Sequence, residues 1–157
     1  MEILTLAGIP VVGQSSKGYF QTTEISDIIC LLKVLDNPLR DIELAAMLRS
    51  PLFNFSDTEL ARIADHKDKI SFYQKLLLCR NTKDIDPALI SKINSMFETL
   101  GRWQKLARQS NIADTLWHIY RNTGYLAFVT ALPDGKQRHA NLLKLHERAI
   151  QIEGFSL

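Results

Sequence analysis

The longest helical pattern in this sequence covers about residues 87–109. Asp86 and Pro87 open it, because aspartate is a favourable N-cap and proline is tolerated at the first helical position. Apolar residues then recur at helical spacing along one stripe: Leu89, Ile93, Met96 or Phe97, Leu100, Trp103 and Leu106 or Ala107. A single helix of this length favours a helical fold for the chain.

Seven shorter helices are predicted from apolar spacing, caps and breakers. The run from Ser56 to Glu59 reads as a capping box, and Asn111 reads as an N-cap. Gly124 is a plausible C-terminal stop, and Pro133-Asp134-Gly135 predicts a turn. The predicted segments cover about 23–35, 39–49, 57–65, 69–79, 112–122, 125–131 and 136–153.

The first twenty residues have a different pattern. Residues 3–12 are rich in β-forming residues, and a turn cluster at 13–18 separates them from a second short strand at Tyr19-Phe20. We therefore predict a mostly α, irregular domain of about eight helices with a short β lead-in at residues 3–20. The expected core is Ile28, Leu32, Leu44, Leu48, Leu60, Ile63, Ile93, Phe97, Leu100, Leu116, Tyr120, Leu142 and Leu145.

Length and composition bound the class of protein. A chain of 157 residues with 46% hydrophobic and 23% charged residues has the size of one domain and can fill a core. Its net charge of +2 is far from that of a strongly basic DNA-binding module, so any nucleic-acid contact must come from local patches. No apolar run is long enough to span a bilayer, no signal peptide is present, and Cys30 and Cys79 read as buried thiols. A cytoplasmic protein is expected.

No motif predicts catalysis, a cofactor or a metal. The run from Gly13 to Gly18 lacks the glycine before the lysine and the Ser or Thr after it that a phosphate loop needs. Helix capping explains the carboxylates of Asp57 and Glu59, and the pair Asp84 and Asp86 lies in a loop that leads to a cap. Neither cysteine has a histidine in a recognisable nucleophile motif.

Two basic groups are candidates for phosphate contact, because such contact needs only a local cluster of cations. One lies at the far end of the 87–109 helix and the other on or before the last helix. The alternative is a solvated charged surface, balanced by Glu98, Glu147 and Glu153. The candidate residues are Arg102, Lys105 and Arg108 in the first group, and Lys136, Arg138, Lys144 and Arg148 in the second.

Three blocks of the sequence carry a resemblance to a known family. The central one runs from Asn37 to Leu52 and reads NPLRDIELAAMLRSPL; the others are Gly8–Val12 with Gly18–Ile25, and Arg138–Leu145. Together they resemble domain 2B of the A subunit in AddAB/RexAB-type bacterial helicase-nucleases, which are UvrD-like superfamily 1 helicases. The first block is similar to the passage from RecA-like domain 2A into domain 2B.

The resemblance implies a division of the chain and a role. Residues 1–20 would be a lead-in from domain 2A, and residues 21–157 a helical 2B domain, excised from a longer protein with an added methionine. The longer protein would be an ATP-dependent 3′→5′ DNA helicase and exonuclease, acting with a B-type subunit in double-strand break repair by homologous recombination. ATP and Mg²⁺ would be bound there, and none of the catalytic residues lies in this chain.

The resemblance also points to duplex DNA at one loop. UvrD-like helicases carry a Gly-Ile-Gly hairpin there, whose backbone approaches duplex phosphates, whereas this chain reads Leu52-Phe53-Asn54-Phe55-Ser56 and has no glycine. Asn54 can adopt a positive φ at modest cost, so the turn is expected to survive. Contact with phosphates is expected at Asn54, at Ser56 and at the N-terminus of the helix that follows.

Two rival functions remain open. The chain could be a helical protein-interaction module without DNA contact, which its near-neutral charge favours. Basic groups on opposite sides of the fold would support that reading. A small metal-dependent hydrolase is the other rival, and it requires carboxylates that converge in a pocket.

Overall fold

The chain folds as a helical domain in the computed structural model, which describes residues 16–65, 69–82 and 85–154. Within these ranges it forms nine helices and no strand, which confirms the mostly α, irregular multi-helix class. In chain order they are α2 (Ser16–Phe20), α3 (Thr23–Asp36), α4 (Asp41–Arg49), α5 (Asp57–Ala64), α6 (Phe72–Cys79), α7 (Pro87–Gln109), α8 (Ile112–Thr123), α9 (Tyr125–Thr130) and α10 (Gly135–Gly154).

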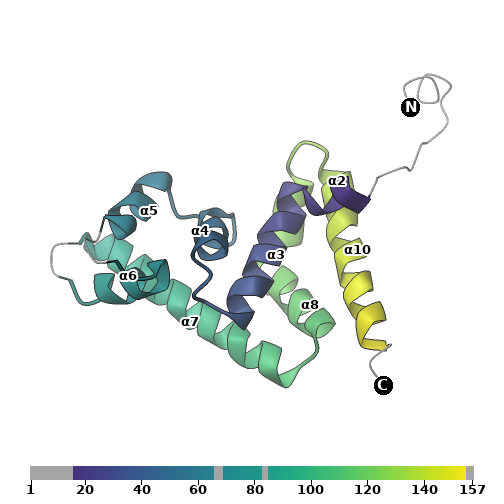
Figure 1. The fold of residues 1–157 in the computed structure, drawn as a ribbon. Helices are drawn as coiled ribbons and strands as arrows, with labels where there is room; N and C mark the ends of the chain where they lie inside the picture. The colour runs from purple at the N-terminus through teal and green to yellow at the C-terminus, as the bar shows by residue number, and fades with distance from the viewer. Residues whose placement is uncertain (1–15, 66–68, 83–84, 155–157) are drawn as a thin grey trace.

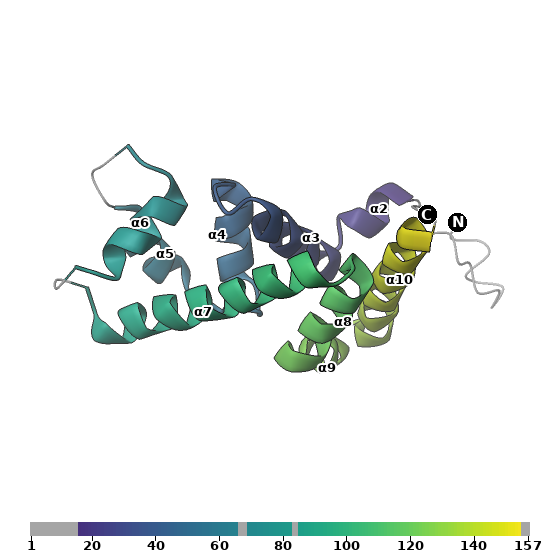
Figure 2. The same ribbon diagram turned by 90° about the horizontal axis from the view of Figure 1, so that it is seen from below.

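Helix α7 runs along most of the molecule (Figures 1 and 2). Its 23 residues make a rod of about 35 Å. Helices α4, α5 and α6 lie along the first part of this rod, and α3 and α8 lie near its end. Beyond them, α10 packs against α3, α8 and α9 and forms the far end of the molecule. The result is an elongated domain with α7 as its longest element.

Two hydrophobic clusters stabilise the two halves. The α7 cluster lies between the apolar stripe of α7 and helices α3, α4, α5 and α6, and the α10 cluster lies between α10 and helices α2, α3, α8 and α9. Helix α3 belongs to both, with Ile25 and Ile28 in the α10 cluster and Leu31 and Val34 in the α7 cluster. The predicted core residues are buried, except for three that are half-buried at its margin: Leu32, Leu60 and Phe97.

Local sequence signals set the helix ends as expected. Ser56 and Glu59 form the predicted capping box of α5, and Asp86 caps α7 with Pro87 in its first turn. The Asn111 side chain accepts the backbone N–H of Asp114, 2.7 Å away, at the start of α8. At its other end Gly124 has φ 64°, the left-handed conformation that a helix stop requires.

The predicted second strand at Tyr19-Phe20 is wrong, because these residues end the short helix α2. The Tyr19 ring is buried in the α10 cluster, and its hydroxyl donates to the backbone oxygen of Asn141, 2.7 Å away. A helical turn directs this ring at α10, whereas the described residues offer no strand with which to pair. Residues 16–18 of the predicted turn cluster are helical as well, in α2, and residues 3–15 of the predicted lead-in lie outside the described residues.

Candidate nucleic-acid interface

The chain between α4 and α5 makes a tight, well-bonded turn. Asn54 has φ 53°, so the prediction that it supplies a positive φ in place of glycine is confirmed. The backbone N–H of Asn54 donates to the oxygen of Ser50 at 2.8 Å, and that of Phe55 donates to the oxygen of Leu48 at 2.9 Å. Because the Phe55 ring is buried while Asn54 is exposed, the turn is anchored in the core with its tip in solvent.

Lys92 of α7 braces this turn from the side. Its Nζ donates to the backbone oxygen of Asn54 and to Oε2 of Glu59, both at 2.8 Å, and lies 4.5 Å from the centre of the Phe55 ring. Sequence reasoning did not single out Lys92, because its partners are more than thirty residues away in the chain. The bracing fixes the position of the turn relative to α7.

The capping box engages two of the backbone N–H donors at the N-terminus of α5. The Ser56 side chain accepts the backbone N–H of Glu59 at 3.1 Å, and the Glu59 carboxylate accepts the backbone N–H of Ser56 at 2.7 Å. The hydrogen bond from Lys92 and that from the Ser56 backbone hold the pKa of Glu59 below its usual value. Asp57 adds a second carboxylate, 3.0 Å from the guanidinium of Arg49. Of the residues predicted in this loop, Asn54 therefore has the free side chain.

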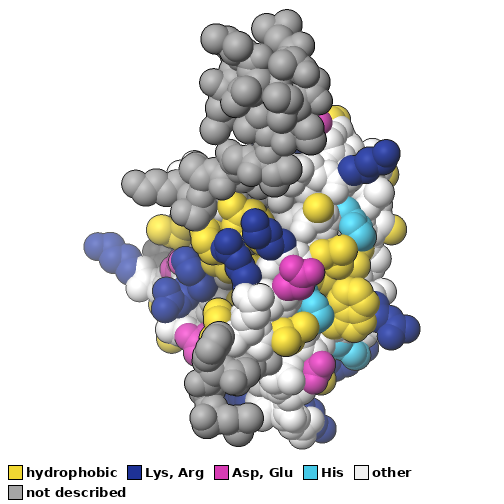
Figure 3. Space-filling model, turned by 90° about the vertical axis from the view of Figure 1, so that its right-hand side faces the viewer, with side chains coloured by type: hydrophobic (Ala, Val, Ile, Leu, Met, Phe, Trp, Pro, Cys, Tyr) yellow, Lys and Arg dark blue, Asp and Glu magenta, His cyan; other side chains and the backbone are white. Residues whose placement is uncertain are grey.

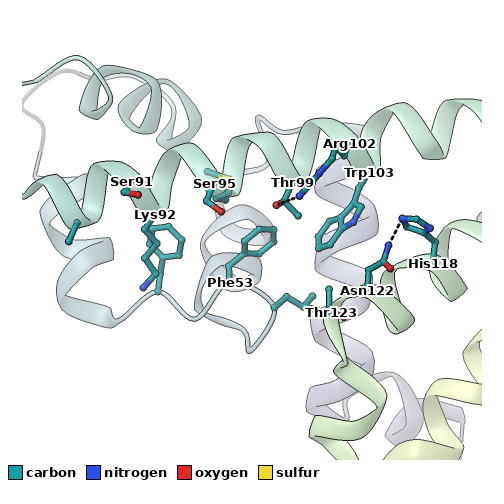
Figure 4. A pocket seen from close by; sticks show the side chains of 14 residues that line it. Phe53, Ser91, Lys92, Ser95, Thr99, Arg102, Trp103, His118, Asn122 and Thr123 are labelled. Carbon is teal, nitrogen blue, oxygen red and sulfur yellow. Dashed lines mark hydrogen bonds between the residues drawn. The ribbon is translucent and has the colours of Figure 1, made fainter.

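A groove of about 820 Å³ opens beside the turn, between α7 and α8 (Figure 4). We call it the α7–α8 groove. Ser91, Ser95 and Thr99 line it from one face of α7, and Phe53 and Trp103 supply its apolar part, with ring centres 5.6 Å apart. The wall contributed by α8 carries His118, Asn122 and Thr123. No aspartate or glutamate is among the described residues that line this groove.

The first predicted basic group divides between two surfaces. Arg102 lines the α7–α8 groove, and its guanidinium donates to the hydroxyl of Thr99 at 3.1 Å. Arg108 instead lines a smaller hollow of about 330 Å³ between α3, α7 and α8. Lys105 lies between them in sequence and is exposed. A spacing of three residues rotates successive side chains round the helix, which explains the division.

The second basic group is tied to the fold more closely than the sequence suggested. The Arg138 guanidinium lies 2.7 Å from the Glu24 carboxylate, whose side chain is 2% exposed. The Asn141 amide donates to the same carboxylate at 2.8 Å. Burial raises the pKa of Glu24, but hydrogen bonds from Asn141, its own backbone N–H and Thr22, together with the charge of Arg138, outweigh burial and hold this pKa below its usual value.

The other members of this group lie at the surface of α10. The Arg148 guanidinium stacks 4.9 Å from the Tyr19 ring centre and 5.6 Å from that of Phe20, and the Lys144 ammonium lies 5.7 Å from Tyr19. Lys136 is exposed in the first turn of α10. Helices α3 and α8 lie between the end of α7 and α10, so the two basic groups do not form one patch (Figures 1 and 2).

The α10 end of the molecule carries a mixed surface (Figure 3). Apolar and histidine side chains lie next to one another there, with lysines, arginines and carboxylates around them. Trp117 of α8 and His146 of α10 are in contact, with ring centres 5.1 Å apart, and the Trp117 side chain remains 39% exposed. Ile150 is exposed on the same helix as His146.

The described residues also bear on metal binding and membrane insertion. Within them, no three side chains of His, Cys, Asp or Glu come close enough to hold a metal ion. Among the helices that the structure describes, none has the length and hydrophobicity needed to cross a membrane.

The sequence is similar to known proteins over nearly its whole length. The family model for the UvrD-like helicase C-terminal domain matches residues 1–150. The A subunit of the ATP-dependent helicase/nuclease from Geobacillus thermodenitrificans is 45% identical over 159 aligned residues, and the A subunits from Geobacillus kaustophilus and Bacillus cytotoxicus are 46% and 42% identical. Each alignment covers 99% of this chain but 13% of the relative, so the chain spans about an eighth of the length of these proteins. The resemblance carried by the three sequence blocks is confirmed, and the chain belongs to the UvrD-like helicase C-terminal domain family.

Proposed function

We propose that this chain is the accessory 2B domain of an ATP-dependent 3′→5′ DNA helicase and exonuclease subunit that acts in double-strand break repair by homologous recombination. Residues 1–20 would then lead in from domain 2A. Its similarity to ATP-dependent helicase/nuclease A subunits over 99% of its length supports this proposal. Because the chain spans 13% of the length of those proteins, we propose that it acts as one domain of a longer protein.

The proposed role is to hold duplex DNA while other domains perform the chemistry. The observation that carries it is the turn at Asn54, which is exposed and is hydrogen-bonded by Lys92. It lies next to a groove that has no carboxylate among the described residues lining it. A rigid polar turn can approach phosphates without a large ordering cost. We assign the DNA contact to Asn54, Arg102 and Lys105.

The remaining predicted contacts take a secondary place in this proposal. Arg138 faces a buried carboxylate, and Lys144 and Arg148 face an aromatic ring of α2, so each already has an intramolecular partner. Arg108 faces a separate hollow, and Ser56 caps α5. We propose that these residues, with Lys136, contribute long-range attraction to DNA rather than direct contacts.

Cofactor chemistry is proposed to lie elsewhere in the longer protein. The absence of a phosphate-loop motif from the sequence supports this placement. We expect ATP and Mg²⁺ to be bound by the other domains, and a B-type subunit to be the protein partner. Purified chain mixed with ATP, Mg²⁺ and DNA should release no phosphate and cut no strand, and turnover in that assay would contradict the proposal.

The DNA contact can be tested by anisotropy of a labelled duplex, titrated with the chain at several salt concentrations. The double variant Arg102→Glu/Lys105→Glu should bind at least about tenfold more weakly at low salt. The matched control is Arg62→Glu/Arg121→Glu, which makes the same change of charge at exposed sites on α5 and α8. Equal loss in both variants would mean that only net charge matters.

A second candidate function is a protein-interaction module without DNA contact. The separation of the two basic groups and the exposure of Trp117 and Ile150 favour it. Binding of duplex that stays undetectable at every salt concentration would select this candidate. In that case Trp117→Glu should weaken binding of a B-type subunit by the longer protein, while the DNA-site variants should leave that binding unchanged.

A further inference from the structure

The α7–α8 groove presents a row of hydroxyl groups that the proposed function has not used. Ser91, Ser95 and Thr99 follow one another at intervals of four residues, so they lie on one face of α7 and each points into the groove (Figure 4). Arg102 continues the row three residues later. From Ser91 to Arg102 the row extends about 16 Å along the helix.

These hydroxyls are available for a ligand. Ser91 and Ser95 are exposed, and their side chains have no hydrogen-bond partner within the described part of the chain. Serine and threonine in a helix commonly satisfy their hydroxyls on a carbonyl one turn earlier, as Thr123 of α8 does with Ile119 at 2.7 Å. The two groove serines do not, so their O–H groups are free to donate outward.

The opposite wall adds donors of a different kind. The Asn122 amide donates one N–H to His118 Nε2, 2.6 Å away, and keeps a second N–H, and both residues line the groove. With Lys92 at one end and Arg102 at the other, the described residues that line the groove supply hydroxyl, amide, imidazole and cationic groups and no carboxylate. Such a lining suits an extended anion, because it offers hydroxyl, amide and cationic donors and none of these lining side chains carries a negative charge.

We propose that the α7–α8 groove binds a sugar-phosphate backbone, with the hydroxyls of Ser91, Ser95 and Thr99 donating to successive phosphates and Arg102 closing the row. An extended row matches a polymer with regularly repeated charge better than a compact anion, which would occupy one end only. This inference rests on the proposed function and adds to it a defined path along α7. The recognition is by neutral hydroxyl donors and by Arg102, since Lys92 at the other end is already paired with Glu59 at 2.8 Å.

The neutral donors provide a sharp test. In the double variant Ser91→Ala/Ser95→Ala no charge is altered, and alanine is a better helix former than serine, so α7 is expected to stay folded. We expect about a tenfold loss of affinity for DNA, with the salt dependence of the affinity unchanged. The single variant Arg102→Gln should instead lower the salt slope by about one unit as well as the affinity. The control is Thr23→Ala/Ser26→Ala, which removes two exposed hydroxyls from α3 and should bind like the parent chain.

Duplex and single-stranded DNA of equal length are measured in parallel, since both carry the same backbone. A tenfold loss of affinity in the serine variant supports the groove proposal, and the substrate that shows the loss is the form of DNA that the groove binds. If the serine variant binds both substrates like the parent chain while Arg102→Glu/Lys105→Glu still weakens binding, the groove proposal is wrong and the proposed function stands. If the parent chain binds neither substrate, both proposals fail.

Discussion

At the scale of single residues, Asn54 adopts a positive φ in a loop where glycine is the usual choice for that conformation. Its φ of 53° lies in the left-handed region, which glycine enters freely, Asn and Asp tolerate, and other residues adopt at a cost of about 1–2 kcal/mol. Asn54→Ala should therefore lower the free energy of unfolding by about 1 kcal/mol, and Asn54→Gly should change it by a few tenths at most. Urea denaturation measures both.

Asp134 supplies a matched control for this prediction. It has φ 58° in the turn before α10, far from the loop after α4. Asp134→Ala should lose a similar amount, because the backbone penalty is the same. If Asn54→Ala were as stable as the parent chain while Asp134→Ala was not, the turn at Asn54 would have to adopt another conformation in solution.

Glu24 makes the stability of the domain depend on pH. Its pKa in the folded chain lies below the ordinary value of 4.5, so its contribution is complete above that value and is lost as pH falls through the folded pKa. Glu24→Gln should cost about 1–3 kcal/mol at neutral pH, since Arg138 loses its charged partner. As pH falls from about 5 to about 3, the free energy of unfolding of Glu24→Gln should also decrease less than that of the parent chain. Denaturant titrations across this range give both quantities.

Arg138→Met should weaken this pH response, because it removes the charge that helps to hold the pKa of Glu24 low. It leaves the Glu24 carboxylate buried and without its cation, which costs about 3–5 kcal/mol at neutral pH. Because protonation then relieves the burial of a charge, the deficit relative to the parent chain should shrink as pH falls. Parallel pH profiles for the parent and both variants would show that Glu24 is not the titrating group.

Residue roles that depend on long-range pairing could not be predicted from the sequence. Asn54 was predicted, because the rule for positive φ is local. The role of Arg138 was not, since Glu24 is 114 positions away and nothing in the local pattern indicates that the two meet. Ser91, Ser95 and Thr99 have a spacing visible in the sequence, but only the position of α8 makes them one wall of a groove.

At the scale of elements, the corner between α9 and α10 depends on the absence of a side chain. A β-carbon on Gly135 would overlap the backbone carbonyl of Thr130, which cannot move aside as a side chain could. Gly135→Ala should therefore force α10 away from α9 and cost about 2–3 kcal/mol or more. Thermal unfolding followed by circular dichroism measures the loss.

Gly101, in the middle of α7, is the matched control for that substitution. Nothing lies within 4 Å of a β-carbon built there, and its backbone is helical. Gly101→Ala should stabilise the domain by about 0.5–1 kcal/mol through helix propensity alone. If Gly135→Ala destabilises the domain while Gly101→Ala stabilises it, the loss arises from the α9–α10 corner. If Gly135→Ala leaves the stability unchanged, the close contact between Gly135 and Thr130 is contradicted.

Helices were predictable at this scale because their signals are local. The capping box of α5, the Asp86-Pro87 start of α7 and the Gly124 stop of α8 each lie within a few residues of the end that they set. The prediction was wrong for Tyr19-Phe20, where aromatic residues favour a strand locally and packing against α10 selects a helix. Tertiary contact decided the outcome there.

At the scale of the whole molecule, the two tryptophans report on the two halves separately. Trp103 is 5% exposed in the α7 cluster, and Trp117 lies on α8 beside His146, on the side of the α10 cluster. Helix α3 contributes to both clusters, so unfolding one half removes packing from the other. We therefore expect a single cooperative transition. In Trp117→Phe and in Trp103→Phe, the fluorescence of the remaining tryptophan and the circular dichroism should give the same urea midpoint.

Coupling between the halves can be tested by damaging one and observing the other. Leu142 is fully buried in the α10 cluster, and Leu142→Ala should cost about 2–5 kcal/mol. In the Trp117→Phe background, the fluorescence of Trp103 should report a fall in the urea midpoint that corresponds to this whole loss of stability, although Trp103 belongs to the α7 cluster. Ile42→Ala, at a side chain that is 83% exposed, should leave the midpoint unchanged. Two separate midpoints would mean that α3, and α8 with Ile119 in the α7 cluster, do not couple the two clusters.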